Sequence, residues 1–304
     1  MSSTFTSIAI ASAQGVVGQA IVHSLASTPG ISTLVLTRKS TPRPAWLPAQ
    51  AARAGVDYND VPGTAAVLRA HKVEVVIFPG MGILQQIPLA DAAKAAGVQL
   101  FVPSEFGTVS KGFPKEEAPD FLKEKLTVAE HLEAIGLPYA RVYPGIFHDF
   151  ALHLVGYTVN RKVNILKGLT GNTPFSITHT NDIGGDALFE GIVCSKAQPI
   201  PGFVAYIVTH YPLSELAWKS FRIEGEHVSF NELAALLGAP AEKVEAIPTE
   251  GFWPVVFLGQ IQTFIERGLL NTETKVVDGD GAGGATHLWK GHKWTGVKEG
   301  LNLQ

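Results

Sequence analysis

The sequence predicts an α/β fold, in which a parallel β-sheet is covered by helices on both faces. Short apolar segments that suit buried strands alternate with longer segments whose apolar residues recur at helical spacing. Strands that alternate with helices pair in parallel, because each crossover returns the chain to the same edge of the sheet. Hydrophobic residues make up 46% and charged residues 17% of the 304 residues, so the chain can bury a large core and is not disordered.

The elements of the first half are expected in strand–helix order. Residues 7–12 read as a buried strand and 14–28 as the helix that follows it. Further strands are expected at 32–37, 73–78, 98–102 and 137–143, and further helices at 86–97 and 118–136. After about residue 150 this rhythm weakens, and only 228–238 reads as a clear helix, with Ser229 or Asn231 near its start and Gly238 at its end. We therefore expect one domain over residues 1–150, to which later segments return, and a second mainly over 151–304.

A glycine-rich turn joins the first strand to the first helix. Its residues follow a G-x-x-G-x-x-G pattern with serine in the first position, and they are Ser12, Ala13, Gln14, Gly15, Val16, Val17 and Gly18. Small residues let the backbone turn tightly, approach a pyrophosphate closely and point a helix N-terminus at it. Glycine also occurs in ordinary turns, but the position at the start of a β-α-β unit favours a dinucleotide-binding loop.

The end of the second strand indicates which dinucleotide is bound. The strand ends in Thr37-Arg38-Lys39 and offers no acid to hold a ribose 2′-hydroxyl. Arg38 can grip a 2′-phosphate through its planar guanidinium, and Lys39 adds a second positive charge. We therefore expect NADP (NADPH) rather than NAD, the alternative being that both side chains are solvated loop charges.

Three later turns follow strands and are expected at the same carboxyl edge of the sheet, where ligands bind in open α/β folds. The further candidates for cofactor binding are Phe78, Pro79, Gly80, Met81, Pro103, Ser104, Glu105, Phe106, Tyr143, Pro144 and Gly145. The candidates for substrate binding are Ile146, Phe147 and His148. His148 is also a candidate catalytic acid, since histidine titrates near neutral pH. The alternatives are a plain Pro-Gly turn, a Ser104 that caps its own turn, and a His148 that makes a structural hydrogen bond.

Lys125 lies at the centre of an apolar helix face. At about 100° per residue, the side chains within about 60° of it are Phe121, Leu122, Val128, Ala129 and Leu132. Burial would lower the pKa of this lysine, so that it can act as an acid/base near neutral pH or hold the cofactor ribose. The alternative is that its ammonium group reaches water past the start of the helix.

Together these motifs resemble the isoflavone-reductase-like, or NmrA-like, branch of the atypical short-chain dehydrogenases/reductases. The resemblance rests on residues 12–18, VLTRK at 35–39, PSEFG at 103–107, Lys125 eleven residues before GLPYARV, and EHVSFNELAALLG at 226–238. It implies an NADP-binding Rossmann domain with a doubly wound parallel sheet, a smaller C-terminal substrate domain, and Lys125 as the catalytic lysine. Typical short-chain dehydrogenases place a tyrosine four residues before this lysine, where the present sequence has Phe121, so the identity of the general acid stays open.

The resemblance leaves three activities open. Lys125 and the pair Arg38-Lys39 favour an NADPH-dependent reductase of a small aromatic or phenylpropanoid-like substrate, with specificity in the second half of the chain. The missing tyrosine favours a non-enzymatic dinucleotide sensor that regulates a partner protein. Quinone reduction is the third activity, and the oligomeric state stays open to a homodimer.

Composition excludes several other classes. A net charge of −3 without a dense Lys/Arg block argues against nucleic-acid binding. We find no metal-ligand spacing among the histidines and expect no metal. The single cysteine, Cys194, cannot form an intrachain disulfide and fits a reducing compartment. No signal peptide and no apolar run of about 20 residues is found, so a cytoplasmic protein without membrane contact is expected.

Overall fold

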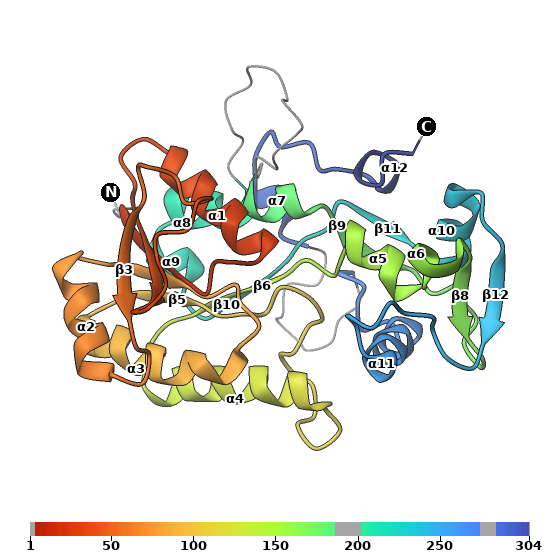
Figure 1. Cartoon of the computed structure of the whole chain (residues 1–304), viewed down its shortest axis with the longest axis horizontal. Coiled ribbons are helices and arrows are strands. Elements are labelled where there is room, and N and C mark those ends of the chain that lie inside the picture. Colours follow the sequence, from red (N-terminus) through yellow and green to blue (C-terminus); the bar gives the residue numbers. More distant parts are fainter. Residues whose placement is uncertain (1–3, 186–201, 274–283, 304) are drawn as a thin grey trace. The chain divides into compact units, whose positions relative to one another are not determined.

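The computed structural model describes residues 4–185, 202–273 and 284–303, and Cys194 lies outside these ranges (Figure 1). The chain divides into two compact units. The first unit comprises Met1–Phe106, Ser110–Val142 and Thr180–Phe221, and the second comprises Gly107–Val109, Tyr143–His179 and Arg222–Gln304. The segment Thr180–Phe221 thus belongs with the first unit although it follows part of the second in the sequence.

A five-stranded parallel sheet in the order β3-β2-β1-β4-β5 forms the centre of the first unit. Its strands are β1 (Ser7–Ala11), β2 (Ser32–Arg38), β3 (Ala52–Val56), β4 (Val75–Ile77) and β5 (Leu100–Val102). A parallel bridge between Phe101 and Tyr139 leads on to β6 (Ala140–Tyr143), which pairs with β10 (Lys219–Arg222). The strand order reverses between β1 and β4, as in Rossmann folds, and the predicted fold class is confirmed.

Helices cover both faces of this sheet (Figure 1). One layer packs α2 against α3 and α3 against α4, and the other packs α1 against α7 and α8. The helices of this unit are α1 (Val16–Ser27), α2 (Val61–Ala70), η1 (Ile83–Gln85), α3 (Gln86–Ala96), α4 (Asp120–Ala134), α7 (Thr180–Gly184), α8 (Phe203–His210) and α9 (Leu213–Leu216). Successive strand residues face opposite layers, so Ala9 and Ala11 pack in the core beneath α2, α3 and α4, while Ile8 and Ile10 face the other side.

The predicted strands lie where they were expected, but β4, β5 and β6 are shorter than the apolar segments that indicated them. The sequence reading missed β3 and α2. β3 is the edge strand and buries only one of its five residues fully, so its sequence, ARAGV, lacks the apolar run of an inner strand. For α2 a signal was present, because Asp60 accepts a hydrogen bond from the backbone N–H of Gly63 and Pro62 stands in the first turn.

The second unit is built from short elements. Its strands form a three-stranded sheet in the order β11-β9-β7 and a parallel pair of β12 with β8. They are β7 (Ile146–Phe147), β8 (Val163–Leu166), β9 (Phe175–Thr178), β11 (Glu226–Val228) and β12 (Ala241–Val244). The helices are α5 (His148–Leu154), α6 (Tyr157–Asn160), α10 (Phe230–Leu237), α11 (Val255–Glu266), η2 (Thr286–Leu288) and α12 (Val297–Gly300). Gln262 on α11 is fully buried and donates to the carbonyls of Leu154 and Asn164, which ties α11 to α5 and β8.

The helix predicted at 228–238 is confirmed as α10. Ser229 caps it, because its hydroxyl accepts from the backbone N–H of Glu232 while the Glu232 carboxylate accepts from Ser229. Gly238 ends it in the left-handed conformation, with φ of 59°. Every helix in the described part of the chain is too short or too polar to traverse a bilayer.

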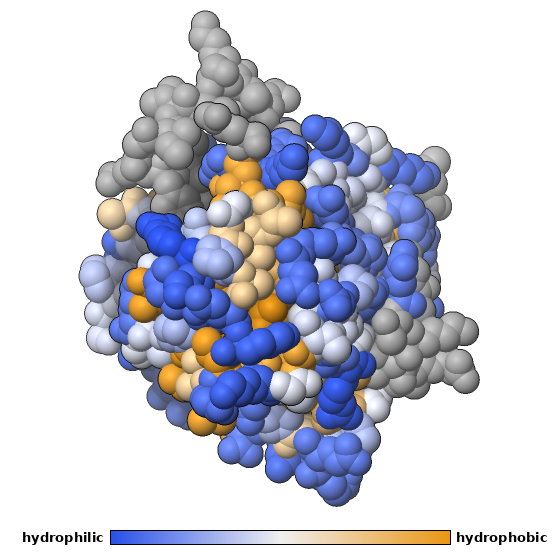
Figure 2. Space-filling model, turned by 90° about the vertical axis from the view of Figure 1, so that its right-hand side faces the viewer, coloured by the Kyte–Doolittle hydropathy of each residue, from blue (hydrophilic) through white to orange (hydrophobic). Residues whose placement is uncertain are grey.

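The face of the second unit seen in Figure 2 is largely hydrophilic, with a band of apolar residues across it. The exposed large apolar side chains of this unit are Val159, Phe252, Val255 and Val256. Trp253, which follows Phe252 in the sequence, packs with Phe150 and Phe257 at ring-centroid distances of 4.8 and 5.6 Å. Aromatic side chains are therefore concentrated where α11 begins.

Candidate active site and family

The turn after β1 contains Ser12 in a left-handed conformation, a tightly packed glycine at Gly18 and an open glycine at Gly15. Ser12 has φ of 55°, a left-handed conformation that explains why glycine is usual at this position of the pattern. A Cβ atom on Gly18 would lie 2.7 Å from the Cα atom of Ala13, so this glycine is needed for α1 to pack on the turn. A Cβ atom on Gly15, the N-cap of α1, would meet nothing within 4 Å. The helix N-terminus is thus open to a ligand at Gly15.

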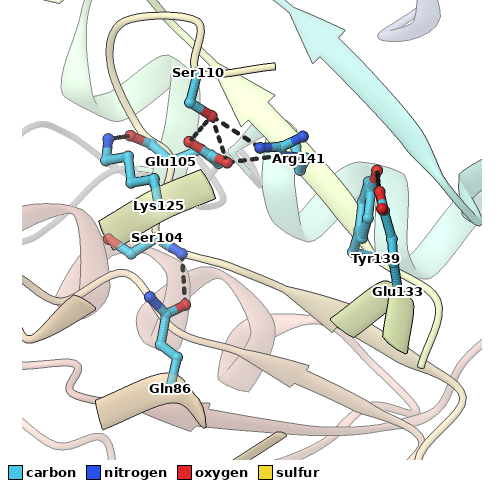
Figure 3. Close-up of polar contacts among 8 residues, drawn as sticks. All are labelled: Gln86, Ser104, Glu105, Ser110, Lys125, Glu133, Tyr139 and Arg141. Carbon is cyan, nitrogen blue, oxygen red and sulfur yellow. Dashed lines mark hydrogen bonds and ion pairs between the residues drawn. The ribbon is translucent and has the colours of Figure 1, made fainter. Parts of the chain in front are cut away.

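The turns that follow β1, β4 and β5 come together, as the sequence predicts. A Cβ atom on Gly80 would lie 2.0 Å from Oγ of Ser12, so this glycine makes room for the serine that replaces the first glycine of the pattern. Ser104 donates from Oγ to the carbonyl of Gly80 at 2.7 Å. Its backbone N–H donates to Oε1 of Gln86 at 2.9 Å (Figure 3). These contacts fix the turns to one another, and Gln86 was not identified from the sequence.

A pocket of about 580 Å³ lies beside these turns, within the size range of small-molecule sites. Its lining residues are Ser12, Ala13, Gln14, Val35, Leu36, Thr37, Arg38, Lys39, Ser40, Thr41, Pro44, Trp46, Val56, Asp57, Tyr58, Asn59, Gln85 and Pro88. Arg38 is exposed, and no hydrogen bond or ion pair joins its side chain to another described residue. Lys39 lies 3.7 Å from Asp60 in an exposed ion pair. The predicted pair Arg38-Lys39 therefore lines a pocket together with the first residues of the glycine-rich turn.

Tyr58 is a lining residue that sequence reasoning missed along with β3. Its ring packs edge-on against Phe78 at 6.3 Å between centroids. Burial raises the pKa of Tyr58, opposed by a hydrogen bond with the backbone of Ser12 and by the charge of Arg38. Tyr58 thus contacts the turn after β1 through Ser12 and lines the same pocket as Arg38. Phe78 itself, a predicted cofactor contact, is fully buried in the core, whereas Met81 in the same turn is 81% exposed.

Lys125 lies on α4 among the apolar residues that the sequence indicated, of which Leu122, Val128, Ala129 and Leu132 are buried. Its Nζ donates to the backbone carbonyl of Glu105, in the turn after β5 (Figure 3). Burial lowers the pKa of Lys125, the Glu105 carboxylate opposes this, and the nearby Arg141 adds to it. The amine is therefore held inside the first unit, on the turn that Ser104 joins to Gly80.

The Glu105 side chain, in contrast, is fully engaged within the protein. Its carboxylate pairs with Nε of Arg141 at 2.7 Å, and the two side chains are 2% and 3% exposed. The Ser110 hydroxyl lies 2.9 Å from both carboxylate oxygens. The Glu105 backbone is engaged as well, because its N–H donates to the carbonyl of Pro103 at 2.8 Å and its carbonyl accepts from Lys125. A role for Glu105 in cofactor binding stays a prediction. Nearby, Tyr139 donates to Glu133 at 2.8 Å, and burial raises the pKa of Tyr139 to about 12.

The remaining predicted residues, Tyr143 to His148, belong to the second unit, where packing accounts for several of them. Gly145 has φ of 68°, and a Cβ atom there would lie 2.3 Å from the carbonyl oxygen of Ser176. Pro144 accepts a hydrogen bond from Thr178 at 2.6 Å, and Tyr143 and Ile146 are buried. His148 is 1% exposed, and a Cβ atom on Gly300 would lie 2.6 Å from its ring. Roles for these residues in cofactor or substrate binding stay predictions.

Comparison with known proteins finds a reductase homologue and a dehydrogenase among the curated relatives of the chain. The isoflavone reductase homolog IRL of Zea mays is 32% identical over 169 residues, 51% of this chain and 53% of that protein. The asnovolin J 5′,6′-dehydrogenase nvfM of Aspergillus novofumigatus is 30% identical over 190 residues, 58% of this chain and 57% of that protein. The chain thus spans about half the length of the curated relatives it matches.

Two solved structures share the fold over nearly the whole chain. A leucoanthocyanidin reductase from Vitis vinifera superposes with a TM-score of 0.74 at 20% identity, covering 97% of this chain and 98% of that one. An isoflavone reductase superposes with a TM-score of 0.71 at 19% identity, covering 98% and 99%. The NmrA-like family model matches residues 4–299. The chain therefore belongs to the NmrA-like family, as its motifs predicted.

Proposed function

We propose that the chain is an NADPH-dependent oxidoreductase of the atypical short-chain dehydrogenase/reductase type, which reduces a small aromatic or phenylpropanoid-like substrate. The observation that carries this proposal is the amine of Lys125, a part-buried residue among the buried apolar side chains of α4. It contacts Glu105 in a turn that is joined through Ser104 and Gly80 to the glycine-rich turn after β1. Removing an amine from water costs free energy. A protein that only senses a dinucleotide has no reason to retain such a group. The names of the curated relatives, isoflavone reductase homologues and a dehydrogenase, support the same class.

The residues of the first unit fit an NADP molecule. Residues 12–18 and the open N-terminus of α1 at Gly15 would receive the pyrophosphate. Arg38 and Lys39 would hold the 2′-phosphate at the mouth of the pocket, and Tyr58 would form one of its walls. The turns at 78–81 and 103–106 would line the nicotinamide half, whereas the Glu105 side chain is held in its ion pair with Arg141.

When bound, NADPH supplies the hydride, and the protein must then supply a proton to the reduced substrate. Lys125 would hold this proton on Nζ and deliver it directly or through a water molecule. Burial lowers the pKa of this group, which brings it closer to the operating pH, where a general acid/base works best. Phe121 cannot donate a proton in place of the missing tyrosine, so Lys125 would carry this role, with His148 as the second candidate.

The second unit would bind the substrate. Phe150, Trp253 and Phe257 form an aromatic cluster in it. Aromatic rings pack favourably on one another in offset or edge-on arrangements, so this cluster suits an aromatic substrate. Ile146 and Phe147 of β7 directly precede α5, which carries Phe150, and would extend the same apolar surface.

Two alternatives are separated by one experiment. The purified protein is titrated with NADPH by calorimetry and then assayed with NADPH and a panel of enones, aldehydes, aromatic ethers and quinones. Turnover of the aromatic substrates supports the proposal, and turnover of quinones alone indicates a quinone reductase. Tight NADPH binding without turnover of any compound contradicts the proposal and indicates the dinucleotide sensor, which the absence of a tyrosine at Phe121 favours.

A further inference from the structure

Glu105, whose backbone carbonyl accepts from Lys125, forms a buried ion pair with Arg141. Nε of Arg141, on β6, donates to Oε1 of Glu105 at 2.7 Å. The Ser110 hydroxyl lies 2.9 Å from both carboxylate oxygens and accepts from Nη2 of Arg141 at 2.9 Å. The carboxylate, guanidinium and hydroxyl thus form a closed triangle (Figure 3). Such a pair contributes little net stability, because desolvation offsets the attraction, so a role beyond stability is worth seeking.

Lys125 contacts the other side of the same residue. Its amine donates to the backbone carbonyl of Glu105, whose side chain Arg141 holds. The backbone on either side is constrained as well. Ser104 is anchored by two hydrogen bonds, to Gln86 and Gly80, and Phe106 has φ of 26°, which a residue other than glycine adopts only when its surroundings hold it there. The carbonyl that receives the amine is therefore fixed in position.

We propose that the ion pair Glu105–Arg141 is a positioning element for Lys125, which fixes the carbonyl that accepts from the amine and balances the charge around it. The inference rests on the proposed role of Lys125 in proton transfer. Two charged groups from outside α4 act on the amine: Glu105 from the turn after β5 and Arg141 from β6. Burial lowers the pKa of Lys125, the Glu105 carboxylate raises it and the Arg141 charge lowers it.

Because Glu105 and Arg141 shift the pKa of Lys125 in opposite directions, their variants distinguish a positioning role of the ion pair from a purely structural one. Glu105→Gln removes the negative charge that raises the pKa of Lys125 and keeps the Arg141 charge that lowers it, so the pKa of Lys125 should fall further, by about one unit. Arg141→Gln leaves the carboxylate unopposed, so the pKa should rise by a similar amount. If the pair were only a structural brace, both variants would loosen the turn, admit water to the amine and raise its pKa.

The experiment measures the pKa of Lys125 in the full-length protein without turnover. Lysines are acetylated competitively with acetic anhydride between pH 6 and 11, and the rate at Lys125 is read by mass spectrometry, with Lys123 on the same helix as internal control. Ser110→Ala keeps both charges and should leave the pKa near the wild-type value. Arg141→Lys keeps the positive charge and should restore the wild-type value from that of Arg141→Gln.

A folded Glu105→Gln protein in which the pKa of Lys125 is unchanged or raised overturns the inference. Glutamine keeps the shape of the side chain, and circular dichroism verifies the fold. If a single variant does not fold, the double variant Glu105→Gln/Arg141→Gln removes both charges, and the pKa of Lys125 in it should stay within about half a unit of the wild-type value. A return of this pKa to the ordinary value of lysine contradicts the proposal. Because no substrate is used, failure here is distinct from failure of the proposed function, which Lys125→Met tests by turnover.

Discussion

Arg38→Ala should weaken the binding of NADPH and leave that of NADH nearly unchanged. Arg38 is exposed at the end of β2, lines the pocket and is joined to no other described residue by a hydrogen bond or ion pair, so its loss should cost the fold little. A hydrogen bond to a charged group contributes about 1.5–3 kcal/mol, and 1.4 kcal/mol corresponds to a tenfold change in Kd. The Kd for NADPH should therefore rise by roughly 10- to 150-fold.

Calorimetry of both cofactors at one fixed salt concentration measures this, since salt screens exposed charges. Lys39→Ala is the matched comparison: Lys39 already pairs with Asp60 at 3.7 Å, so its removal should weaken NADPH binding less than the loss of Arg38. Equal affinity of the wild type for NADPH and NADH, or an equal loss of both in Arg38→Ala, would refute the assignment of this pocket to the 2′-phosphate.

Two further predictions concern the glycine-rich turn and the alkaline stability. Gly18→Ala places a Cβ atom 2.7 Å from Ala13 and should lower the free energy of unfolding by about 1–3 kcal/mol in urea. A Cβ atom on Gly15 would meet no protein atom within 4 Å, so Gly15→Ala should keep the stability of the wild type but weaken NADPH binding about tenfold. Loss of stability with unchanged NADPH affinity would contradict the conclusion that the N-terminus of α1 is open to a ligand at Gly15. Because burial lowers the pKa of Lys125, the unfolded chain binds more protons between the folded pKa and the ordinary lysine value, and stability rises with pH through that window. The stability gained by Lys125→Met relative to the wild type should thus be largest below the folded pKa and shrink as pH rises; a difference independent of pH would show that the pKa is not lowered.

Much of the fold could be predicted, because the inner strands of a parallel sheet are apolar throughout. β1, β2, β4 and β5 each lie within such an apolar segment. In α1 and α3, which lie between them, apolar residues recur at helical spacing. The edge strand β3 and, apart from α10, the elements of the second unit were not predicted, since these elements are short. There the hydrophobic pattern is too brief to separate strand from helix.

The candidate site could be predicted where a short contiguous segment holds the residues that indicate cofactor binding. Residues 12–18 and Arg38-Lys39 are such segments, and the structure places Ser12, Ala13 and Gln14 with Arg38 and Lys39 at one pocket. Tyr58, Gln86 and Arg141 were missed because their roles depend on partners that only tertiary folding supplies, such as the pairing of Arg141 with a carboxylate 36 residues away. For the same reason the ion pair of the Glu105 side chain could not be predicted, and the predicted role of Glu105 in cofactor binding stays a prediction.

Turnover by Lys125→Met tests the proposed function most directly. Methionine keeps the length of the side chain and removes the amine, so the fold and NADPH affinity should persist while turnover of a verified substrate falls by about 10²- to 10⁴-fold, the usual contribution of a positioned acid/base. Lys123→Met, about 200° away around α4, is the matched control and should retain wild-type turnover. A Lys125→Met protein that binds NADPH and turns over at the wild-type rate would contradict the role of this lysine.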